Sequence, residues 1–419
     1  PVISIAGVCG DEAQVFVHTE AKDPAFTTCR DELATIVAFE RWLRDIDPDV
    51  LIGWNVIDFD LRVLIARAQT HGVELALGRG NTRTTLRKSR GRGGTLASVT
   101  GRVVLDGGPT LRASGYFSSS YALEHVSQEL LGTGKTIAPQ VEDKAAEIQR
   151  LHAESPAELA AYNKQDCALV RDIFVKQDLL GYVLERQRLT GLALDRQGGS
   201  VAAFDYLYLP RLHRKGFVAP TINSKQRGEM SPGGYVLKGE PGLFKNVLVF
   251  DFKSLYPSII RTFLVDPLGM VMAKEAQTPV AGFRGASFHR DAHILPGLLT
   301  ELWHARDEAK QRKDSARSYA IKILMNSFYG VLGTTGCRFF DPRLASSITL
   351  RGHEVIMGSK ALMEAWGHEV VYGDTDSLFV RVGDALSPQS CAEVGRRIAL
   401  DINTFWRKQF EEEHGIESF

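Results

Sequence analysis

Apolar positions in the N-terminal third of the chain alternate between short strand-like runs and stretches with helical spacing. The strand-like runs are residues 2–8 and 49–54, and the helical stretches are residues 33–43, 60–70, 123–131 and 156–184. Strands that alternate with helices are typical of an α/β domain, so we expect one here. Ser155 and Pro156 suit the N-cap and the first turn of the last helix.

Helical spacing returns in the second half, after a proline and glycine cluster at 231–242 that marks a new region. Residues 298–329 are predicted to form two helices with a break near Asp314, where Asp314 or Ser315 can cap the second helix. Another long helix is predicted to begin after Asp341 and to end near Gly367. The pattern indicates a helical hairpin followed by a single long helix.

Three acidic residues lie at the ends of strands predicted in this second half. An apolar strand at 246–252 contains Asp251, and a tight turn between two short strands contains Asp374 and Asp376. Those two strands are residues 369–373 and 377–382. Neighbouring carboxylates repel one another unless a cation compensates them, and oxygen ligands suit Mg²⁺ or Mn²⁺. The three acids could therefore bind the two metal ions of two-metal phosphoryl transfer. An ordinary Gly/Asp turn is an open alternative.

The predicted helical hairpin carries basic residues at matching levels. Arg306 and Lys322 are equally far from the turn, Lys310 lies one helical turn from Arg306, and Asn326 lies one turn from Lys322. An anion between the helices would reverse the repulsion among these cations, and a triphosphate is the natural candidate. A solvated face explains the first helix well. It explains the second helix poorly, because Lys322 interrupts an apolar run.

Composition limits the kinds of partner that we expect. The 419 residues suggest two or three domains at roughly 150 residues each, and the 44% hydrophobic content can bury real cores. Lys+Arg and Asp+Glu number 50 each, so any site for a polyanion must be local. The five cysteines include no C-x-x-C pair, and no apolar run approaches about 18 residues. We expect a cytoplasmic protein without a disulfide framework, a structural zinc or a membrane partner.

A glycine-rich stretch at 78–94 contains six basic residues and no acidic residue. They are Arg79, Arg83, Arg87, Lys88, Arg90 and Arg92. The stretch could contact phosphates, but a solvated loop is the simpler interpretation because this composition buries little apolar surface.

Three segments resemble motifs A, B and C of the family B DNA polymerases, in that order: residues 251–259, 322–330 and 372–377. Residues 334–349 are similar to a bacterial branch of the family, and the likeness extends over essentially the whole chain. The resemblance implies an α/β and α+β multidomain fold. A ribonuclease H-like exonuclease domain would precede a polymerase palm with a helical-hairpin fingers insertion.

The resemblance also implies roles for individual residues of the polymerase region. Asp251, the backbone of Phe252 and Asp376 would bind two Mg²⁺ or Mn²⁺ ions, with Asp374 beside them and Lys322 assisting catalysis. The residues implied to bind the nucleotide are Phe252, Ser254, Leu255, Tyr256, Arg306, Lys310, Lys322, Asn326, Tyr329 and Gly330. Tyr256 would act as a steric gate against a 2′-hydroxyl. The template-contacting residues would be Ser231, Gly233 and Gly234, although Ser231 replaces the tyrosine usual in the family.

The N-terminal third resembles the 3′–5′ proofreading exonuclease of the family at residues 55–60 and 162–166. Asp60 and Asp166 would bind metal, and Tyr162 would position the attacking water. Tyr162 and Asp166 lie at i and i+4, on one helix face, as joint action requires. A simpler interpretation of Asp60 and the nearby Asp58 is that both are helix N-terminal acids favoured by the dipole.

The chain departs from the family pattern at both ends. No Asp-x-Glu sequence, the first exonuclease motif, occurs, and the basic Lys-x-Tyr motif and the thumb are missing, so we expect a fragment truncated at both ends. The expected parts are a partial exonuclease domain at 1–185, a linker and start of the palm at 186–240, palm with motif A at 241–297, fingers at 298–333, and palm with motif C at 334–419.

The expected function is template-dependent addition of dNTPs to a primer 3′-hydroxyl in DNA replication and repair, with proofreading in the intact protein. The implied partners are primer–template DNA, dNTPs and, for the intact protein, a sliding clamp, and the implied location is the bacterial nucleoid. A catalytically silent DNA-binding scaffold and a nuclease alone are the alternatives. The scaffold is disfavoured because motifs A and C keep all their acids.

Overall fold

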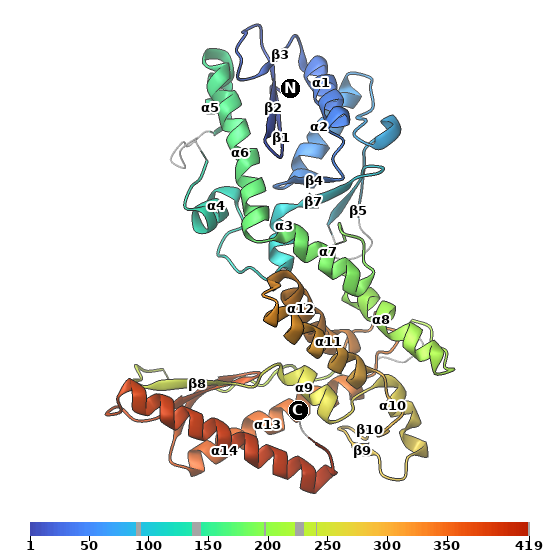
Figure 1. The fold of residues 1–419 in the computed structure, drawn as a ribbon, viewed down its shortest axis with the longest axis vertical. Helices are drawn as coiled ribbons and strands as arrows, with labels where there is room; N and C mark the ends of the chain where they lie inside the picture. Colours follow the sequence, from blue (N-terminus) through green and yellow to red (C-terminus); the bar gives the residue numbers. More distant parts are fainter. Residues whose placement is uncertain (89–93, 136–143, 197, 223–229, 240, 418–419) are drawn as a thin grey trace. The chain divides into compact units, whose positions relative to one another are not determined.

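The structure is a computed structural model, and its contacts divide the chain into two compact units. Unit 1 is Pro1–Gly199 and unit 2 is Ser200–Phe419 (Figure 1). The described residues are all of 1–419 except 89–93, 136–143, 197, 223–229, 240 and 418–419.

Unit 1 combines short sheets with helices, as the alternating pattern predicts. Its strands are β1 (Ser4–Cys9), β2 (Glu12–His18), β3 (Thr27–Cys29), β4 (Val50–Gly53), β5 (Thr85–Lys88), β6 (Thr95–Ser98) and β7 (Val103–Asp106). Its α-helices are α1 (Glu32–Ile46), α2 (Arg62–Thr70), α3 (Gly107–Ala113), α4 (Leu123–Leu131), α5 (Lys144–Glu154), α6 (Pro156–Lys176) and α7 (Leu179–Thr190). A π-helical turn η1 (Val56–Leu61) and a 3₁₀ turn η2 (Arg79–Asn81) complete it.

The sheets of unit 1 bring distant segments together. β1 pairs antiparallel with β2, β2 pairs parallel with β3, and β4 pairs parallel with β7. Apolar residues of α1, α2 and β7 form one buried core, which includes Ile36, Leu64 and Val104. The register of β4 and β7 sets Gly53 opposite Asp106, so the chain leaves β4 beside a buried carboxylate.

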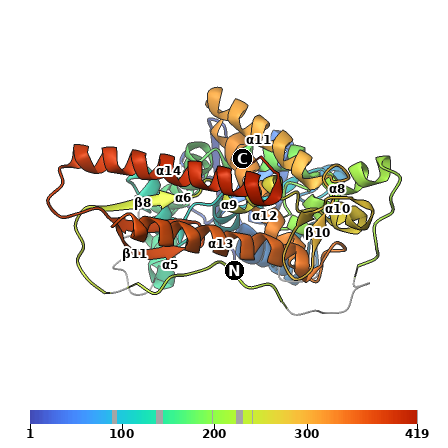
Figure 2. The ribbon, with the colours of Figure 1, turned by 90° about the horizontal axis from the view of Figure 1, so that it is seen from below.

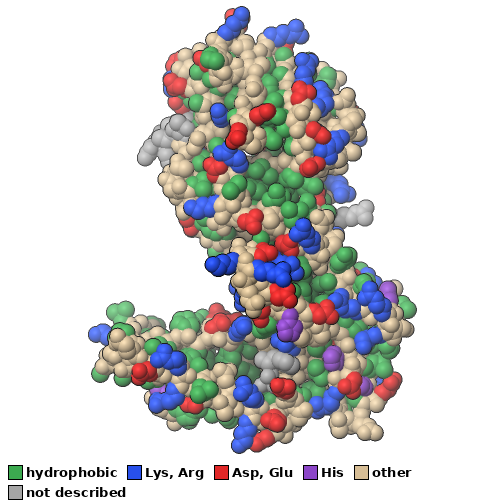
Figure 3. All heavy atoms as spheres, viewed as in Figure 1, with side chains coloured by type: hydrophobic (Ala, Val, Ile, Leu, Met, Phe, Trp, Pro, Cys, Tyr) green, Lys and Arg blue, Asp and Glu red, His purple; other side chains and the backbone are tan. Residues whose placement is uncertain are grey.

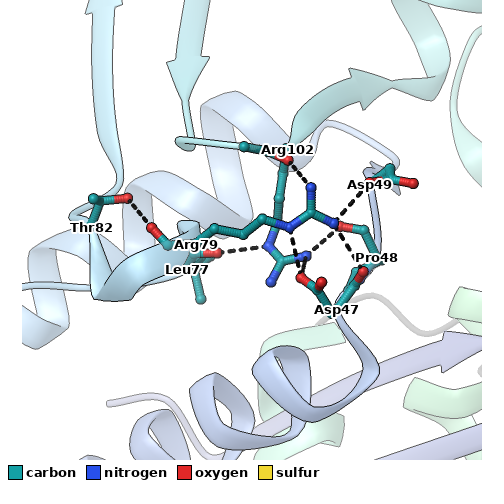
Figure 4. Close-up of polar contacts among 8 residues, drawn as sticks. Asp47, Pro48, Asp49, Leu77, Arg79, Thr82 and Arg102 are labelled. Atoms are coloured by element: carbon teal, nitrogen blue, oxygen red, sulfur yellow. Dashed lines mark hydrogen bonds and ion pairs between the residues drawn. The ribbon is translucent and has the colours of Figure 1, made fainter.

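Within the glycine-rich stretch, residues 85–88 form β5, which pairs antiparallel with β6, and two arginines hold the segments that flank this pair (Figure 4). Arg102, with a side chain 1% exposed, donates to Leu77 O at 3.0 Å and pairs with Asp47 at 2.9 Å. Arg79 pairs with both Asp47 and Asp49 at 2.8 Å. We call Arg79, Arg102, Asp47 and Asp49 the arginine clasp. Of the six basic residues noted above, Arg90 and Arg92 lie outside the described residues.

Unit 2 contains the remaining elements. Its helices are α8 (Ser200–Arg214), α9 (Leu255–Thr262), α10 (Pro267–Met272), α11 (Leu295–Gln311), α12 (Ser315–Leu332), α13 (Pro342–Ala365) and α14 (Pro388–His414), with a 3₁₀ turn η3 (Ala273–Glu275). Its strands are β8 (Val247–Asp251), β9 (Val280–Ala281), β10 (Ser287–Phe288), β11 (Glu369–Asp374) and β12 (Ser377–Arg381).

A three-stranded antiparallel sheet in the order β11-β12-β8 is the centre of unit 2. The long helices α13 and α14 pack against it and against each other, and they run alongside it in two perpendicular views (Figures 1 and 2). Leu378 and Val380 of β12 are fully buried on alternate positions of the strand. The sheet is therefore supported along its length, and its end toward Asp251 is the point at which the predicted acids gather.

Most of the predicted helix boundaries are confirmed, with two corrections. The hairpin breaks as expected before α12, where the Asp314 carboxylate, and not Ser315, accepts from Arg317 N at 3.0 Å. The helix predicted over 156–184 is in fact α6 and α7, because Asp178 adopts a left-handed conformation with φ 45° between them. Ser155 precedes α6, but its side chain does not cap the helix.

The surface charges, the cysteines and the lengths of the helices can be compared with what the composition predicts. Acidic and basic side chains are interspersed over the face that Figure 3 shows, in keeping with the zero net charge. All five cysteines are free thiols. Within the described part of the chain, no helix is both long and apolar enough to span a membrane.

Candidate active sites

The three acids predicted to meet lie at one end of the unit 2 sheet. β8 ends at Asp251, which pairs with Ser377, and Ser377 in turn pairs with Asp374. Phe252 N donates to the carbonyl oxygen of Asp376 at 2.8 Å, which holds the segment after β8 against the turn. We call Asp251, Asp374 and Asp376 the acidic tip.

The acidic tip is short of positive charge. Burial first, and then the charges of Asp251 and Asp374, raise the pKa of Asp376. No Lys or Arg in the described residues forms an ion pair with any of the three acids. Such a donor set fits a hard divalent cation, because a cation would offset this repulsion and carboxylate oxygens are its preferred ligands. Among the described residues, no group of three or more His, Cys, Asp or Glu side chains is arranged so that it could hold a metal ion.

Residues 231–237, which we call the strap, lie directly on the turn of the acidic tip. Thr375 N donates to Tyr235 O at 2.8 Å, and Leu237 N donates to Gly373 O at 2.9 Å. Gly234 approaches so closely that a Cβ there would lie 2.3 Å from Thr375 Oγ1. The strap thus extends the sheet edge beside the acids, which explains why a residue without a side chain is needed at Gly234.

Side chains of α12 and α13 hold the other end of the strap. Ser231 and Thr349 share a hydrogen bond of 2.9 Å between their hydroxyl oxygens, and the His353 ring lies 2.8 Å from Gly233 O. The Tyr329 hydroxyl lies 3.5 Å from Pro232 O. Of the three residues assigned to template contact from the sequence, Gly234 therefore lies against the turn of the acidic tip, whereas Ser231 and Gly233 contact α13.

Tyr256 lies in the first turn of α9, close to both the acidic tip and α12. Its ring centroid is 4.6 Å from that of Tyr329. Burial first, then the neighbouring Tyr329 and the acids of the tip, raise the pKa of Tyr256 to about 12. Its other side faces α13, where a Cβ at Gly352 would lie 3.3 Å from the ring. Packing on two sides leaves the ring little freedom to move.

Exposed polar residues follow one side of α12. Lys322, Asn326 and Gly330 recur every four residues and are exposed, whereas Met325 and Phe328 are buried. The Lys322 ammonium lies 6.0 Å from the ring centroid of Tyr319, the residue one turn earlier. The face predicted from the sequence thus exists on α12, and it is open to solvent.

The facing helix α11 carries Arg306 and Lys310. Lys310 lies 3.8 Å from Asp307, so part of its charge is balanced within its own helix. Arg306 differs, because its Nε is buried and has no hydrogen-bond partner in the described residues. A buried guanidinium nitrogen without an acceptor is a costly arrangement that an anionic ligand would relieve.

In unit 1, the turn that carries Asp58 and Asp60 is held by a residue that the sequence analysis missed. Asp106, at the end of β7, accepts from Asn55 N at 3.0 Å and from Ile57 N at 3.5 Å. Burial raises the pKa of Asp106, and these backbone hydrogen bonds oppose the rise. Asp106 therefore fixes the start of η1, where Asn55 is left-handed with φ 60°.

Asp60 and Asp166 come together with Tyr162, as expected, and with a lysine that was not expected. Lys135 Nζ lies 2.6 Å from Asp166 Oδ2 and 5.6 Å from the ring centroid of Tyr162. Although Asp60 reaches the surface, desolvation by surrounding protein, and then the charges of Asp106 and Asp166, raise its pKa to about 6. We call Asp60, Asp106, Asp166, Tyr162 and Lys135 the carboxylate–lysine site.

Asp58 does not face this site. It forms an ion pair with Arg62, one turn along, and accepts from Thr95 Oγ1 at 2.7 Å. Its pKa is lowered by the Thr95 hydrogen bond and by Arg62. The interpretation as a helix N-terminal acid thus suits Asp58, whereas Asp60 has the surroundings of a functional carboxylate.

Two family models match the chain. The model of DNA polymerase family B matches residues 196–414, and that of the DNA polymerase family B exonuclease domain matches residues 2–126. The matches fall in unit 2, apart from a few preceding residues, and in unit 1 respectively. The order of an exonuclease domain followed by a polymerase domain agrees with the expected fold.

Known proteins show the same likeness. The chain is 48% identical to DNA polymerase II of Escherichia coli (strain K12) over 376 residues, which is 89% of this chain and 48% of that protein. It is 30% identical to the DNA polymerase delta catalytic subunit of Glycine max, over 90% of this chain and 38% of that protein. The protein of the same name from Oryza sativa subsp. japonica is also 30% identical, over 90% of this chain and 37% of that protein. The chain thus spans about half, or less, of the length of these relatives.

A solved structure agrees over the whole chain. The family B DNA polymerase from the hyperthermophilic archaeon Pyrobaculum calidifontis matches 100% of this chain and 53% of its own, with a TM-score of 0.72 and 25% identity. Together with the family model that covers more than half of the residues, this shows that the chain belongs to DNA polymerase family B.

Proposed function

We propose that the chain supplies the polymerase centre of a DNA-directed DNA polymerase, which adds dNTPs to a primer 3′-hydroxyl as a template directs. The observation that carries the proposal is the acidic tip, which places three acidic residues at one end of the sheet without a Lys or Arg partner among the described residues. We further propose that residues 298–333 are the fingers and that 241–297 and 334–419 form the palm. Primer–template DNA and dNTPs are the proposed substrates, and the intact protein would use a sliding clamp.

The acids and the neighbouring backbone have distinct proposed roles. Asp251, Asp376 and the carbonyl of Phe252 would hold two Mg²⁺ or Mn²⁺ ions, with Asp374 beside them. When bound, such ions supply activation of the primer hydroxyl and neutralisation of the triphosphate charge. The amides of Ser254 and Leu255, at the N-terminus of α9, suit the phosphates because their N–H groups are unused at a helix start.

Side chains of α11 and α12 would complete the nucleotide site. Arg306 and Lys310 would bind phosphates from α11, and Lys322 and Asn326 would do so from α12. The buried, unpartnered Nε of Arg306 supports this assignment. Lys322, which is exposed, would also protonate or neutralise the leaving pyrophosphate.

Tyr256 and Tyr329 would form the wall of the nucleotide site. Their rings pack against each other at 4.6 Å, and Tyr256 is further confined by α13. A ring held on two sides can exclude a 2′-hydroxyl, which is the proposed role of Tyr256. Tyr329 and Gly330 would line the new base pair, and the strap, through Ser231, Gly233 and Gly234, would face the template.

A second proposed centre is the 3′–5′ exonuclease of unit 1. Asp60 and Asp166 would bind metal, and Tyr162 would position the attacking water. Their approach within the carboxylate–lysine site supports this role, because the charges of Asp166 and Asp106 both raise the pKa of Asp60. Lys135 compensates Asp166 in the structure and could stabilise negative charge on a cleaved phosphate.

Primer extension with Mg²⁺, on this chain and on a longer parent, tests the polymerase proposal. We expect extension that EDTA and Asp251→Ala abolish. Asp384→Asn is the matched control, because Asp384 is an acid of unit 2 that pairs with Arg381 at 2.7 Å and should leave extension intact. Tight DNA binding without extension by the parent would instead favour a silent DNA-binding scaffold.

A further inference from the structure

The base of the fingers helix α11 is built around a buried carboxylate that none of the proposed catalytic roles uses. Asp266 is 0% exposed and lies between α9 and α10. Its Oδ1 accepts from Leu295 N at 2.7 Å and from Ile294 N at 3.1 Å, the first amides of α11. Its Oδ2 accepts from Gly269 N at 2.8 Å, in the first turn of α10. One side chain therefore caps two helices.

The cap on α11 is unusual because it comes from a distant part of the chain. The N-cap residue of α11 is Ile294, which has no side-chain acceptor of its own. Helix starts normally recruit Ser, Thr, Asp or Asn at this position, and isoleucine is among the poorest choices. The start of α11 thus depends on Asp266, which also benefits from the positive ends of two helix dipoles.

Tyr208 of α8 completes this arrangement. Its hydroxyl lies 3.0 Å from Asp266 Oδ2 and accepts from Leu268 N at 3.1 Å, and the side chain is fully buried. The ring packs against that of Phe204, with the ring centroids 5.1 Å apart, and against that of Phe339, with the ring centroids 4.8 Å apart. Rigid aromatic neighbours fix the hydroxyl, and the hydroxyl fixes the carboxylate.

A second attachment ties α11 to the motif A helix α9. Arg261, which is 8% exposed, donates from Nε to Thr300 Oγ1 at 3.1 Å, and its guanidinium carbon lies 4.9 Å from the ring centroid of Trp303. The first half of α11 is therefore joined to the palm at its start and again about one to two turns later. Arg306 and Lys310 follow directly on the same helix.

Because α11 is long, a small change in its direction at the base causes a large displacement of side chains farther along the helix. Leu295 and Arg306 are eleven residues apart, about 16 Å along a helix. A tilt of about 5° at the base would displace Arg306 by about 1.4 Å, given this length. A displacement of this size would lengthen a contact between Arg306 and a phosphate beyond hydrogen-bonding distance, which would weaken nucleotide binding.

We propose that Asp266 and the Tyr208 hydroxyl are positioning groups that set the direction of α11, and through it the placement of Arg306 and Lys310 against the nucleotide triphosphate. The inference rests on the proposed polymerase function. It assigns to a buried cluster, which touches no substrate, part of the enzyme's affinity for dNTPs.

Steady-state primer extension by the full-length parent enzyme tests the proposal with Tyr208→Phe and Asp266→Asn. Tyr208→Phe keeps the buried ring and is the variant expected to fold. We expect its KM for dNTP to rise about fivefold, as loss of one hydrogen bond predicts, with kcat within twofold and DNA affinity unchanged. Tyr206→Phe is the matched control, because Tyr206 lies on the same helix with 55% exposure and should leave KM unchanged.

Hydrogen exchange provides a readout that does not depend on activity. In Tyr208→Phe, peptides that include residues 294 and 295 should exchange at least several times faster, while peptides from α13 should not change. Faster exchange with an unchanged dNTP KM would overturn the proposal and leave the cluster a purely structural role. Unchanged exchange in Tyr208→Phe would overturn the role of the hydroxyl, and unchanged exchange in Asp266→Asn would overturn the cap itself. A parent enzyme that does not extend primers would refute the proposed function. The exchange result would still show whether the buried cluster stabilises the start of α11.

Discussion

The two carboxylate centres of this molecule differ in how their negative charge is compensated. In unit 1, Lys135 pairs with Asp166, and backbone amides satisfy Asp106. In unit 2, the acidic tip has no Lys or Arg partner among the described residues, and burial together with the charges of Asp251 and Asp374 raises the pKa of Asp376. The difference teaches that the acids of unit 2 depend on positive charge from outside the described residues for compensation, whereas those of unit 1 have a lysine beside them.

The largest effect that would test this contrast is expected at the acidic tip. Asp376→Asn should reduce primer extension about 1000-fold or more, because metal-borne stabilisation of the transition state is worth several kcal/mol. Its melting temperature in EDTA should stay the same or rise, since one of three mutually repelling charges is gone. Rapid-quench extension and thermal melting measure the two effects. A clear loss of stability in EDTA would mean that the tip is already compensated.

A smaller loss is expected when the cationic side of the same centre is weakened. Lys322→Ala should lower kcat/KM for dNTP by about tenfold to a hundredfold, because a hydrogen bond to a charged group contributes about 1.5–3 kcal/mol. The dNTP dependence of single-turnover extension measures it. Lys313→Ala, beyond the end of α11, is the control. If DNA binding weakened while dNTP dependence stayed normal, Lys322 would contact the duplex instead.

In unit 1, replacing an aspartate by asparagine should lower the stability, whereas in unit 2 it should leave the stability unchanged or raise it. Asp166→Asn leaves Lys135, whose side chain is 22% exposed, without its anionic partner. We expect a local destabilisation of about 1.5–3 kcal/mol, as for a hydrogen bond to a charged group. Hydrogen exchange of α6 peptides in EDTA measures it, and Asp172→Asn, on the same helix, is the control. Greater protection in Asp166→Asn would erase the contrast between the two centres.

The smallest expected effect is a pH dependence at Asp60. Its pKa rises from 3.8 to about 6 in the folded state, so folded protein binds the proton more tightly and this contribution to stability falls as pH rises between these values. Asp60→Asn should therefore stabilise unit 1 at pH 8 by about 1 kcal/mol, after allowance for solvent screening, and much less at pH 4. Denaturant unfolding in EDTA at both pH values measures it. An equal gain at both would deny that charge is the cause.

Local patterns in the sequence predicted much of the fold. The break before α12, the start of α13 at Asp341 and the acidic hairpin turn each depend on neighbours within a few residues. The division of the helix predicted at 156–184 escaped notice, because apolar spacing continues across Asp178 while its backbone turns left-handed. Periodicity reports which residues are buried, but it does not report a single unusual backbone angle.

The candidate sites were predictable where a motif lies within one segment. Asp106 and Lys135 were missed, because each contributes through a segment remote in sequence, as when Asp106 holds the amides of η1. The strap was assigned only by resemblance, since backbone pairing with Gly373 and Thr375 leaves no side-chain pattern. An acid at the end of β7, facing the end of β4, is the signal that could have found Asp106.

The arginine clasp has a consequence for how the hairpin β5–β6 can change over evolutionary time. Arg102 secures the chain just after the hairpin, Arg79 secures it just before, and both reach Asp47 at the end of α1. Residues added or removed in the sequence between β5 and β6 would therefore not pull on the core of unit 1. The number of residues between β5 and β6 could therefore change, in evolution or by design, without a change in the stability of the domain that contains them.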